Sequence, residues 1–316
     1  MTRIFASAVA LALVVTLQSP GAQQAPSAGT LVSTWTLVAV ERGVGGGQVT
    51  RAQGPRGLLI LDAKGHVFEF FGVGSRQEPD APQAAPQRAF SNYGGFWGRY
   101  EADPKAGRLR FTALDGVSPN MHDAAFSRSF ELTGERMTMT SIDEPHAHGG
   151  TRWTWERVPT VDHLSPLYRQ VVGFWQHEVE GRVNLDTGEV LSQTRRAPSV
   201  IVYTPGGYVG VHFPSLGRKP FAADTPTAEE APAALRGYLG YYGTLGVYPG
   251  EVFHNLLAGV SPAAGSVLRR SAEIAGDTLT VKLQPLGGGG GRGGPRTTTY
   301  VTLRRLSGVE DMLPRP

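Results

Sequence analysis

The sequence GLLILDAKGHV at residues 57–67 recurs 142 residues later as SVIVYTPGGYV at residues 199–209. Each copy has an apolar run, then a short segment of turn-forming residues, then a second apolar run. This order predicts a β-hairpin, because Gly, Pro and Asp end a strand and let the chain reverse. The repeat therefore indicates a chain built from two copies of one β-rich unit.

Other segments repeat in the same order along the chain. Trp35 and Trp175 each follow a short apolar stretch, and they lie 140 residues apart. The sequence GVSP occurs at 116–119 and 259–262, and WTWER at 153–157 corresponds to VTLRR at 301–305. Ordered matches with slowly drifting spacing are typical of an internal duplication. We therefore predict an all-β fold of two tandem antiparallel barrels, since closing each sheet removes its exposed edges.

The termini and the junction set the predicted boundaries. Arg3, the apolar residues 4–17 and the small residues that follow are typical of an export signal, and the apolar run is shorter than the ~20 residues of a membrane span. We expect a periplasmic or extracellular protein that does not span a membrane. The predicted parts are a signal at 1–22, a flexible leader at 23–29, domain 1 at 30–159, a linker at 160–166, domain 2 at 167–307 and a tail at 308–316.

Composition limits the classes of function. Hydrophobic residues make up 40% of the 316 residues and charged residues 18%, so each half has enough apolar residues for a core. The net charge is +3 without a basic block, so no nucleic-acid partner is expected. No cysteine is present, which excludes disulfides and a lipid-modified cysteine. The composition leaves the oligomeric state open.

Each half resembles the bacterial lipocalin-like domain family. The resemblance rests on an apolar residue four positions before Trp35 or Trp175, on the hairpin that contains Gly65 or Gly207, and on the Ser-Pro segments at 118–119 and 261–262. An Arg-containing strand that ends in a Gly-Glu-Arg or Gly-Asp-Thr turn completes it. The resemblance covers nearly the whole mature chain and implies small β-barrels. It also implies a Trp–Arg pair that closes one end of each barrel.

Two arginines occupy matching positions on predicted strands. Arg128 alternates with Phe126 and Phe130, and Arg270 alternates with Leu268, so both side chains should face the barrel interior. A buried guanidinium needs a partner. One interpretation is a clamp for a ligand carboxylate or phosphate. The other, which the resemblance favours, is stacking on Trp35 or Trp175.

His254 marks a difference between the two halves. It alternates with Val252 and Leu256 and should point inward, whereas the first half has Phe111 at this position. His254 is either a polar group of a ligand cavity or a core histidine bonded to a neighbouring tyrosine. We expect any specific ligand site in the second barrel. Its predicted residues are His254, Arg270 and Tyr242, with Arg128 as the counterpart in the first barrel; Tyr238, Tyr241, Tyr242 and Tyr248 are expected in the cavity wall or core.

Three other segments have weaker patterns. His146 and His148 follow two carboxylates and are weak metal-ligand candidates in a loop between two strands. Glycine-rich residues 287–294 lack the ending of a phosphate loop. The Ala- and Pro-rich stretches 78–90 and 222–235 are placed across a barrel mouth, and Pro232 is expected to limit the second one to about one helical turn.

The leading functional hypothesis is a module that binds a small, mostly apolar molecule in a barrel cavity without a cofactor. The second hypothesis is a cofactor-free hydratase, isomerase or cyclase acting on a lipid-like substrate, since paired domains of this resemblance occur in such enzymes. On that hypothesis His254 and Arg270 carry the activity; no catalytic residue is assigned otherwise. The third is a structural or protein-contact role with filled barrels.

Overall fold

The structure is a computed structural model that describes residues 28–46, 48–74, 90–144, 150–195, 197–223, 225–261, 264–283 and 296–312. The expected signal, the leader up to residue 27, stretch 78–89, His146, His148 and the glycine-rich loop lie outside the described residues. No helix of the described residues has the length and hydropathy needed to cross a membrane.

Barrel 1 is a closed antiparallel sheet. Among the described residues it has nine strands, and eight of them form a ring because β1 pairs with both β3 and β9, while β2 only extends β1. A short helix, α1 (Ala28–Leu31), precedes it, and a 3₁₀ helix, η1 (Pro119–Met121), follows β6. The strands are β1 (Ser33–Arg42), β2 (Thr50–Arg51), β3 (Arg56–Leu61), β4 (His66–Gly72), β5 (Tyr93–Asp103), β6 (Arg108–Gly116), β7 (Ala125–Thr133), β8 (Arg136–Ser141) and β9 (Thr151–Arg157).

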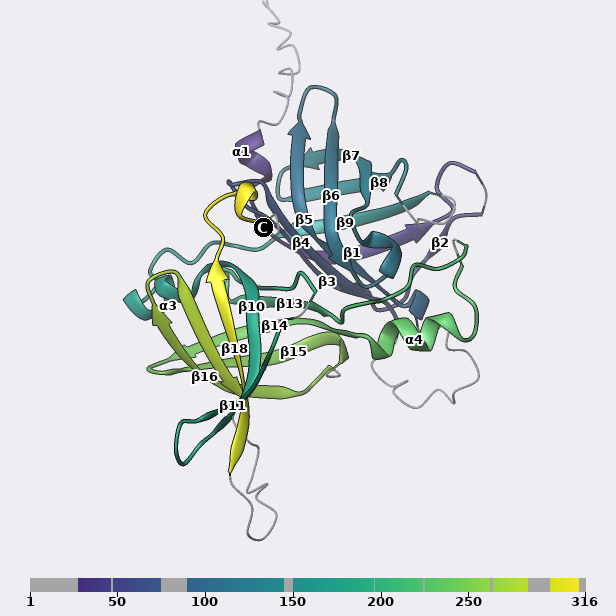
Figure 1. The fold of residues 1–316 in the computed structure, drawn as a ribbon. Coiled ribbons are helices and arrows are strands. Elements are labelled where there is room, and N and C mark those ends of the chain that lie inside the picture. Colours follow the sequence, from purple (N-terminus) through teal and green to yellow (C-terminus); the bar gives the residue numbers. More distant parts are fainter. Residues whose placement is uncertain are drawn as a thin grey trace, which may run out of the picture.

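Barrel 2 has the same topology, with β10 pairing with both β12 and β18 in the described sheet. Its helical elements are α3 (Pro166–Val171), α4 (Glu230–Arg236) and the 3₁₀ helix η2 (Val309–Met312). Figure 1 shows it as the lower barrel, with η2 returning to barrel 1. The strands are β10 (Gly173–Asn184), β11 (Val190–Thr194), β12 (Val200–Tyr203), β13 (Tyr208–Pro214), β14 (Tyr238–Tyr248), β15 (Glu251–Ser261), β16 (Val267–Ala275), β17 (Thr278–Leu283) and β18 (Thr297–Arg305).

Strand register confirms the two tandem barrels predicted from the repeat. Phe111 is opposite Phe126 in barrel 1, and His254 is opposite Leu268 in barrel 2. The pairing of β1 with β9 is irregular after Leu37, and the pairing of β10 with β18 is irregular after His177, 140 residues later. Positions in the two barrels can therefore be compared one by one.

The two repeated tryptophans are fully buried and fix one end of each barrel. The indole N–H of Trp35 donates to the carbonyl of Leu31 (3.2 Å), and that of Trp175 donates to the carbonyl of Val171 (2.7 Å). Thus each tryptophan ties β1 or β10 to the turn before it. A buried N–H that finds an acceptor avoids the cost of desolvation.

The arginines that stack on these tryptophans come from the last strand of each barrel. Arg157 lies over Trp35 at 4.2 Å, and Arg305 lies over Trp175 at 4.0 Å. The expectation that Arg128 stacks on Trp35 is wrong, since its guanidinium lies over Trp153. Barrel closure explains this, because β9 and β18 lie beside β1 and β10 although they are far away in sequence.

A third apolar cluster joins the barrels, in addition to the two barrel cores. We call it the interface cluster; the outward side chains of β3 and β4 pack there against β12, β14 and α4. Gly210 has no room for a Cβ, because the ring of Phe68 fills that space. His212 Nε2 donates to the carbonyl of Glu69 across this contact (2.8 Å). Its buried members include Leu58, Ile60, Phe68, Phe70, Trp97, Phe174, Val202, Tyr238, Tyr242, Ala258, Leu306 and Met312.

Two expectations about the second half need correction. Helix α4 has seven residues rather than one turn, because Pro232 lies in the first turn, where its missing N–H costs little. Thr227 and Glu230 exchange two side-chain-to-backbone hydrogen bonds where the helix begins, and Ala231 and Ala234 pack into the interface cluster. Tyr248 was expected in the core or cavity wall but is 58% exposed.

Candidate functional site

Inside barrel 2, four polar side chains meet in an otherwise apolar core. Tyr203 comes from β12, Tyr241 from β14, His254 from β15 and Arg270 from β16. The three rings are fully or almost fully buried, and Arg270 is half-buried. Alternation along each strand places these side chains on the inward face, among the residues of the barrel core. We call this group the barrel-2 polar cluster.

His254 is held between the two tyrosines. Its Nδ1 lies 2.8 Å from the Tyr241 hydroxyl, and its Nε2 lies 3.2 Å from the Tyr203 hydroxyl. Burial, and then the charge of Arg270, lowers the pKa of His254 well below its usual value. The imidazole is therefore neutral at pH 7, and a neutral imidazole offers one donor and one acceptor. One tyrosine donates to the ring and the other accepts from it.

Arg270 extends this chain of hydrogen bonds at Tyr241. Burial raises the pKa of Tyr241, and the neighbouring Arg270 guanidinium opposes that rise as a charge and as a hydrogen-bond donor. The Tyr241 hydroxyl that accepts from Arg270 can still either donate to His254 Nδ1 or accept from it, so both neutral tautomers of His254 fit this arrangement. In either tautomer, the tyrosine that accepts from the imidazole keeps its own hydroxyl proton available to a further acceptor.

In barrel 1, the matching arginine is Arg128, and two carboxylates of the same barrel neutralise its charge. Arg128 is fully buried and makes a paired contact with Glu69, through NH1 to Oε2 at 2.5 Å and NH2 to Oε1 at 3.0 Å. It donates also to Glu144, at 2.7 and 2.6 Å. Burial opposes the charge on Arg128, but Glu144 and Glu69 together raise its pKa above the ordinary value. In barrel 1, the arginine is thus part of a buried ion triad.

Barrel 2 has no counterpart of Glu69. Glu69 is opposite Leu59, and Val211 is opposite Ile201 in the same place of barrel 2. Among the described residues, no carboxylate forms an ion pair with Arg270. A half-buried guanidinium without a counter-charge is costly in a protein interior. The arginine of barrel 2 is therefore available to a negatively charged group from outside the described chain.

Smaller side chains surround Arg270 than Arg128. Register places Ala272 where barrel 1 has Phe130, and Val301 where it has Trp153. Phe130 and Trp153 are buried, whereas Ala272 and Val301 are only half-buried. The inward row of β16 is half-exposed in barrel 2, and most of the matching row of β7 is buried in barrel 1. Barrel 2 is thus less tightly filled around its arginine than barrel 1.

Tyr242 lies on the other face of its strand. It belongs to the interface cluster, where its ring centroid is 6.4 Å from that of Phe70. The structure therefore brings together His254 and Arg270 but not Tyr242. Sequence reasoning missed Tyr203 as a partner of His254, although its alternation with Ile201 was visible. It also missed Glu69 as the partner of Arg128. A carboxylate between Phe68 and Phe70 in an otherwise apolar strand could have indicated a buried ion pair.

The weak metal candidates are not supported by their described neighbours. His146 and His148 lie outside the described residues. Of the two carboxylates before them, Asp143 accepts from the backbone N–H of Ser127 (2.5 Å), and Glu144 is bound to Arg128. Within the described part of the chain, no group of three or more potential ligands converges on one point.

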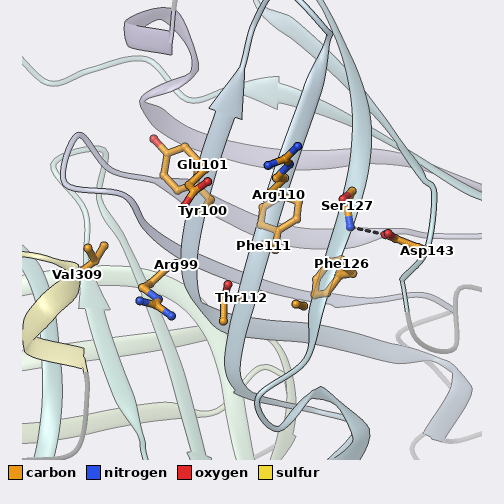
Figure 2. A pocket seen from close by; sticks show the side chains of 11 residues that line it. Arg99, Tyr100, Glu101, Arg110, Phe111, Thr112, Phe126, Ser127, Asp143 and Val309 are labelled. Atoms are coloured by element: carbon orange, nitrogen blue, oxygen red, sulfur yellow. Dashed lines mark hydrogen bonds between the residues drawn. The ribbon is translucent and has the colours of Figure 1, made fainter.

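A groove of about 380 Å³ lies along β5, β6 and β7 of barrel 1, with Val309 of η2 on its lining (Figure 2). Arg99 and Arg110 are on its lining, together with Glu101 and Asp143. These charges balance, and Asp143 already bonds the Ser127 backbone. The groove therefore presents no net charge that would select a ligand.

Comparison with known proteins gives no family. No protein-family model matches the chain, and no curated protein matches its sequence. Similar solved structures include a "putative outer membrane protein" of Bacteroides fragilis NCTC 9343, with 10% identity over 88% of this chain and 98% of that one, at a TM-score of 0.23. Another is a variant of the vaccine antigen Transferrin Binding Protein B from Haemophilus parasuis Hp5, with 8% identity over 87% and 76%, also at 0.23. Values this low support no inference about function.

Proposed function

We propose that the chain is an exported binding protein whose second barrel holds a small, largely apolar molecule with a carboxylate group. One observation carries this proposal. The equivalent arginines share strand position and register, yet Arg128 has two carboxylate partners and Arg270 has none among the described residues. A ligand carboxylate supplies the missing charge.

The barrel-2 polar cluster suits such a group. Arginine binds carboxylates through paired N–H donors, and these charge-assisted bonds are stronger than neutral ones. The tyrosine that accepts from His254 has a free hydroxyl proton, which adds a second kind of donor. Leu268, Ala272 and Ile274 of β16 are half-buried and offer apolar surface to the rest of the ligand.

The enzyme hypothesis is less well supported. A general base needs a nitrogen that can reach the proton of a substrate. Both ring nitrogens of His254 are already within hydrogen-bonding distance of tyrosine hydroxyls. We therefore assign His254 the role of fixing the two tyrosines in place. Barrel 1, with its filled core and neutralised arginine, takes the structural role.

The test compares a ligand with its uncharged analogue. Decanoic acid and decanol are titrated against the whole protein, and binding is measured by thermal shift and calorimetry. We expect the acid to raise the melting temperature and the alcohol to have a smaller effect. The substitution Arg270→Gln should weaken the binding of decanoic acid about tenfold or more, because a charge-assisted hydrogen bond is lost.

Arg269→Gln is the matched control. Arg269 is the neighbour of Arg270, but it points outward and pairs with Glu251 on the surface. This variant should bind the acid as well as the original protein. Equal stabilisation by acid and alcohol, or equal loss of binding in both variants, would contradict the proposal.

A further inference from the structure

The hairpin formed by β10 and β11 projects from barrel 2 (Figure 1) and has an open edge. All five residues of β11 are exposed, and within the described sheet β11 pairs only with β10. A strand edge of this kind presents backbone N–H and carbonyl groups that another strand can pair with. Most proteins protect such edges with charge, proline or extreme shortness.

Neither charge nor proline protects the five residues of strand β11. Its sequence, VLSQT, has no charge and no proline, and Val190 and Leu191 are 49% and 46% exposed. The matching strand in barrel 1, β2, has only two residues and includes Arg51. Nearby Leu185, in the turn of the hairpin, is 41% exposed. Among the described residues, barrel 2 therefore has a longer edge strand without charge or proline, and barrel 1 has only the short β2 in its place.

The segment around β11 carries opposite charges at its two ends, so it is complementary to a second copy of itself in antiparallel orientation. The segment reads Glu189-Val-Leu-Ser-Gln-Thr-Arg195, with Ser192 at its centre. When two copies pair antiparallel about Ser192, each Glu189 lies opposite the other copy's Arg195. Val190 then lies opposite Thr194, a pair of β-branched residues that suits adjacent strands. We propose that β11 pairs with β11 of a second copy of this chain around a two-fold axis.

The contact is small, so the dimer is weak and reversible. A pairing of five residues buries far less than the ~1,200 Å² of a stable complex. The edge is also shortened by a bulge, because Ser192 pairs with Arg182 and Val190 pairs with the next residue, Val183. Leu191 is thus the extra residue and twists the start of the strand. Around the two-fold axis, Ser192–Thr194 of each copy faces Val190–Ser192 of the other, so the bulge lies inside the contact and further weakens it.

A single cysteine tests the pairing directly, because the chain has no cysteine of its own. In Ser192→Cys, the two-fold axis places both sulfur atoms opposite each other. Paired strands have Cα separations of about 4.5–5.5 Å, which suits a disulfide. A mild oxidant should therefore produce a linked dimer quickly. Leu216→Cys is the control, because Leu216 is 68% exposed and lies away from β11, so it reports random collision.

Charge reversal in the Ser192→Cys background tests the register. Glu189→Arg alone and Arg195→Glu alone should each slow cross-linking about fivefold, because each places like charges opposite each other twice. The double reversal restores the attraction and should restore the rate to within about twofold. Cross-linking no faster than in Leu216→Cys, or a double variant as slow as the single ones, would overturn the proposal.

Discussion

Barrel 1 surrounds Arg128 with two carboxylates and four aromatic rings, whereas barrel 2 leaves Arg270 half-buried beside two tyrosines and a histidine. The backbone register at the two positions is the same. The difference lies in a few inward side chains, above all Glu69 against Val211. It shows how a duplicated barrel can keep its frame while one copy fills its core and the other keeps polar groups available.

The largest expected effect is on stability. Arg128→Met leaves Glu69 and Glu144 without their counter-charge in the core, and removing one partner of a buried pair costs about 3–5 kcal/mol. Arg270→Met removes no described ion pair and should cost less than about 1 kcal/mol. Urea denaturation of both variants gives the two free energies of unfolding. Equal losses would remove the distinction between the barrels.

A second prediction concerns acid. Burial lowers the pKa of His212 to about 3, and burial with Arg270 lowers that of His254. A histidine whose folded pKa is below its unfolded value of about 6.5 contributes full stability above pH 6.5 and loses it as the pH falls. Barrel 1 has Phe70 and Phe111 at these positions, so this acid sensitivity belongs to barrel 2.

The measurement compares unfolding free energies at pH 6.5 and pH 5. His212 alone should account for a loss of about 2 kcal/mol over this interval, since each pH unit is worth about 1.4 kcal/mol. In His212→Gln that part of the loss should be absent. If the variant lost as much stability as the original protein, His212 would not be the group that titrates.

The smallest expected effect comes from a variant that gives Arg270 of barrel 2 a carboxylate partner, as Arg128 has in barrel 1. Val211→Glu places a carboxylate where barrel 1 has Glu69, and Arg270 should pair with it. Binding of decanoic acid should then weaken about tenfold, because the arginine is no longer free. Val211→Gln has the same size without the charge and should bind at least three times more tightly than Val211→Glu. Equal binding by the two variants would show that charge at this position does not control the site.

The sequence was sufficient to predict the strands, the duplication and the inward direction of the side chains of Arg128, His254 and Arg270. All of these follow from alternation and spacing, which are local properties. The partners of these residues were not predictable in the same way. Arg157 meets Trp35 only because the sheet closes, and closure determines which distant strand lies beside β1.

The interface cluster also escaped the sequence interpretation, although β4 carried a sign of it. Its seven residues, His66–Gly72, are all buried, and a strand that is apolar on both faces is covered on both. Alternation shows that Glu69 and Phe70 face opposite sides, but not that the outer side meets a second barrel. Tyr242 was assigned to the cavity for the same reason. Both faces of β14 are covered, so burial alone does not show which face points into the barrel.

The shared interface has an evolutionary consequence. Phe68 and Phe70 pack against the wall of the second barrel, so each copy covers apolar surface of the other. A deletion that removed either repeat would uncover that surface in the remaining one. Loss of one repeat would therefore carry a cost in the stability and solubility of the other, even though the interiors of the two barrels differ.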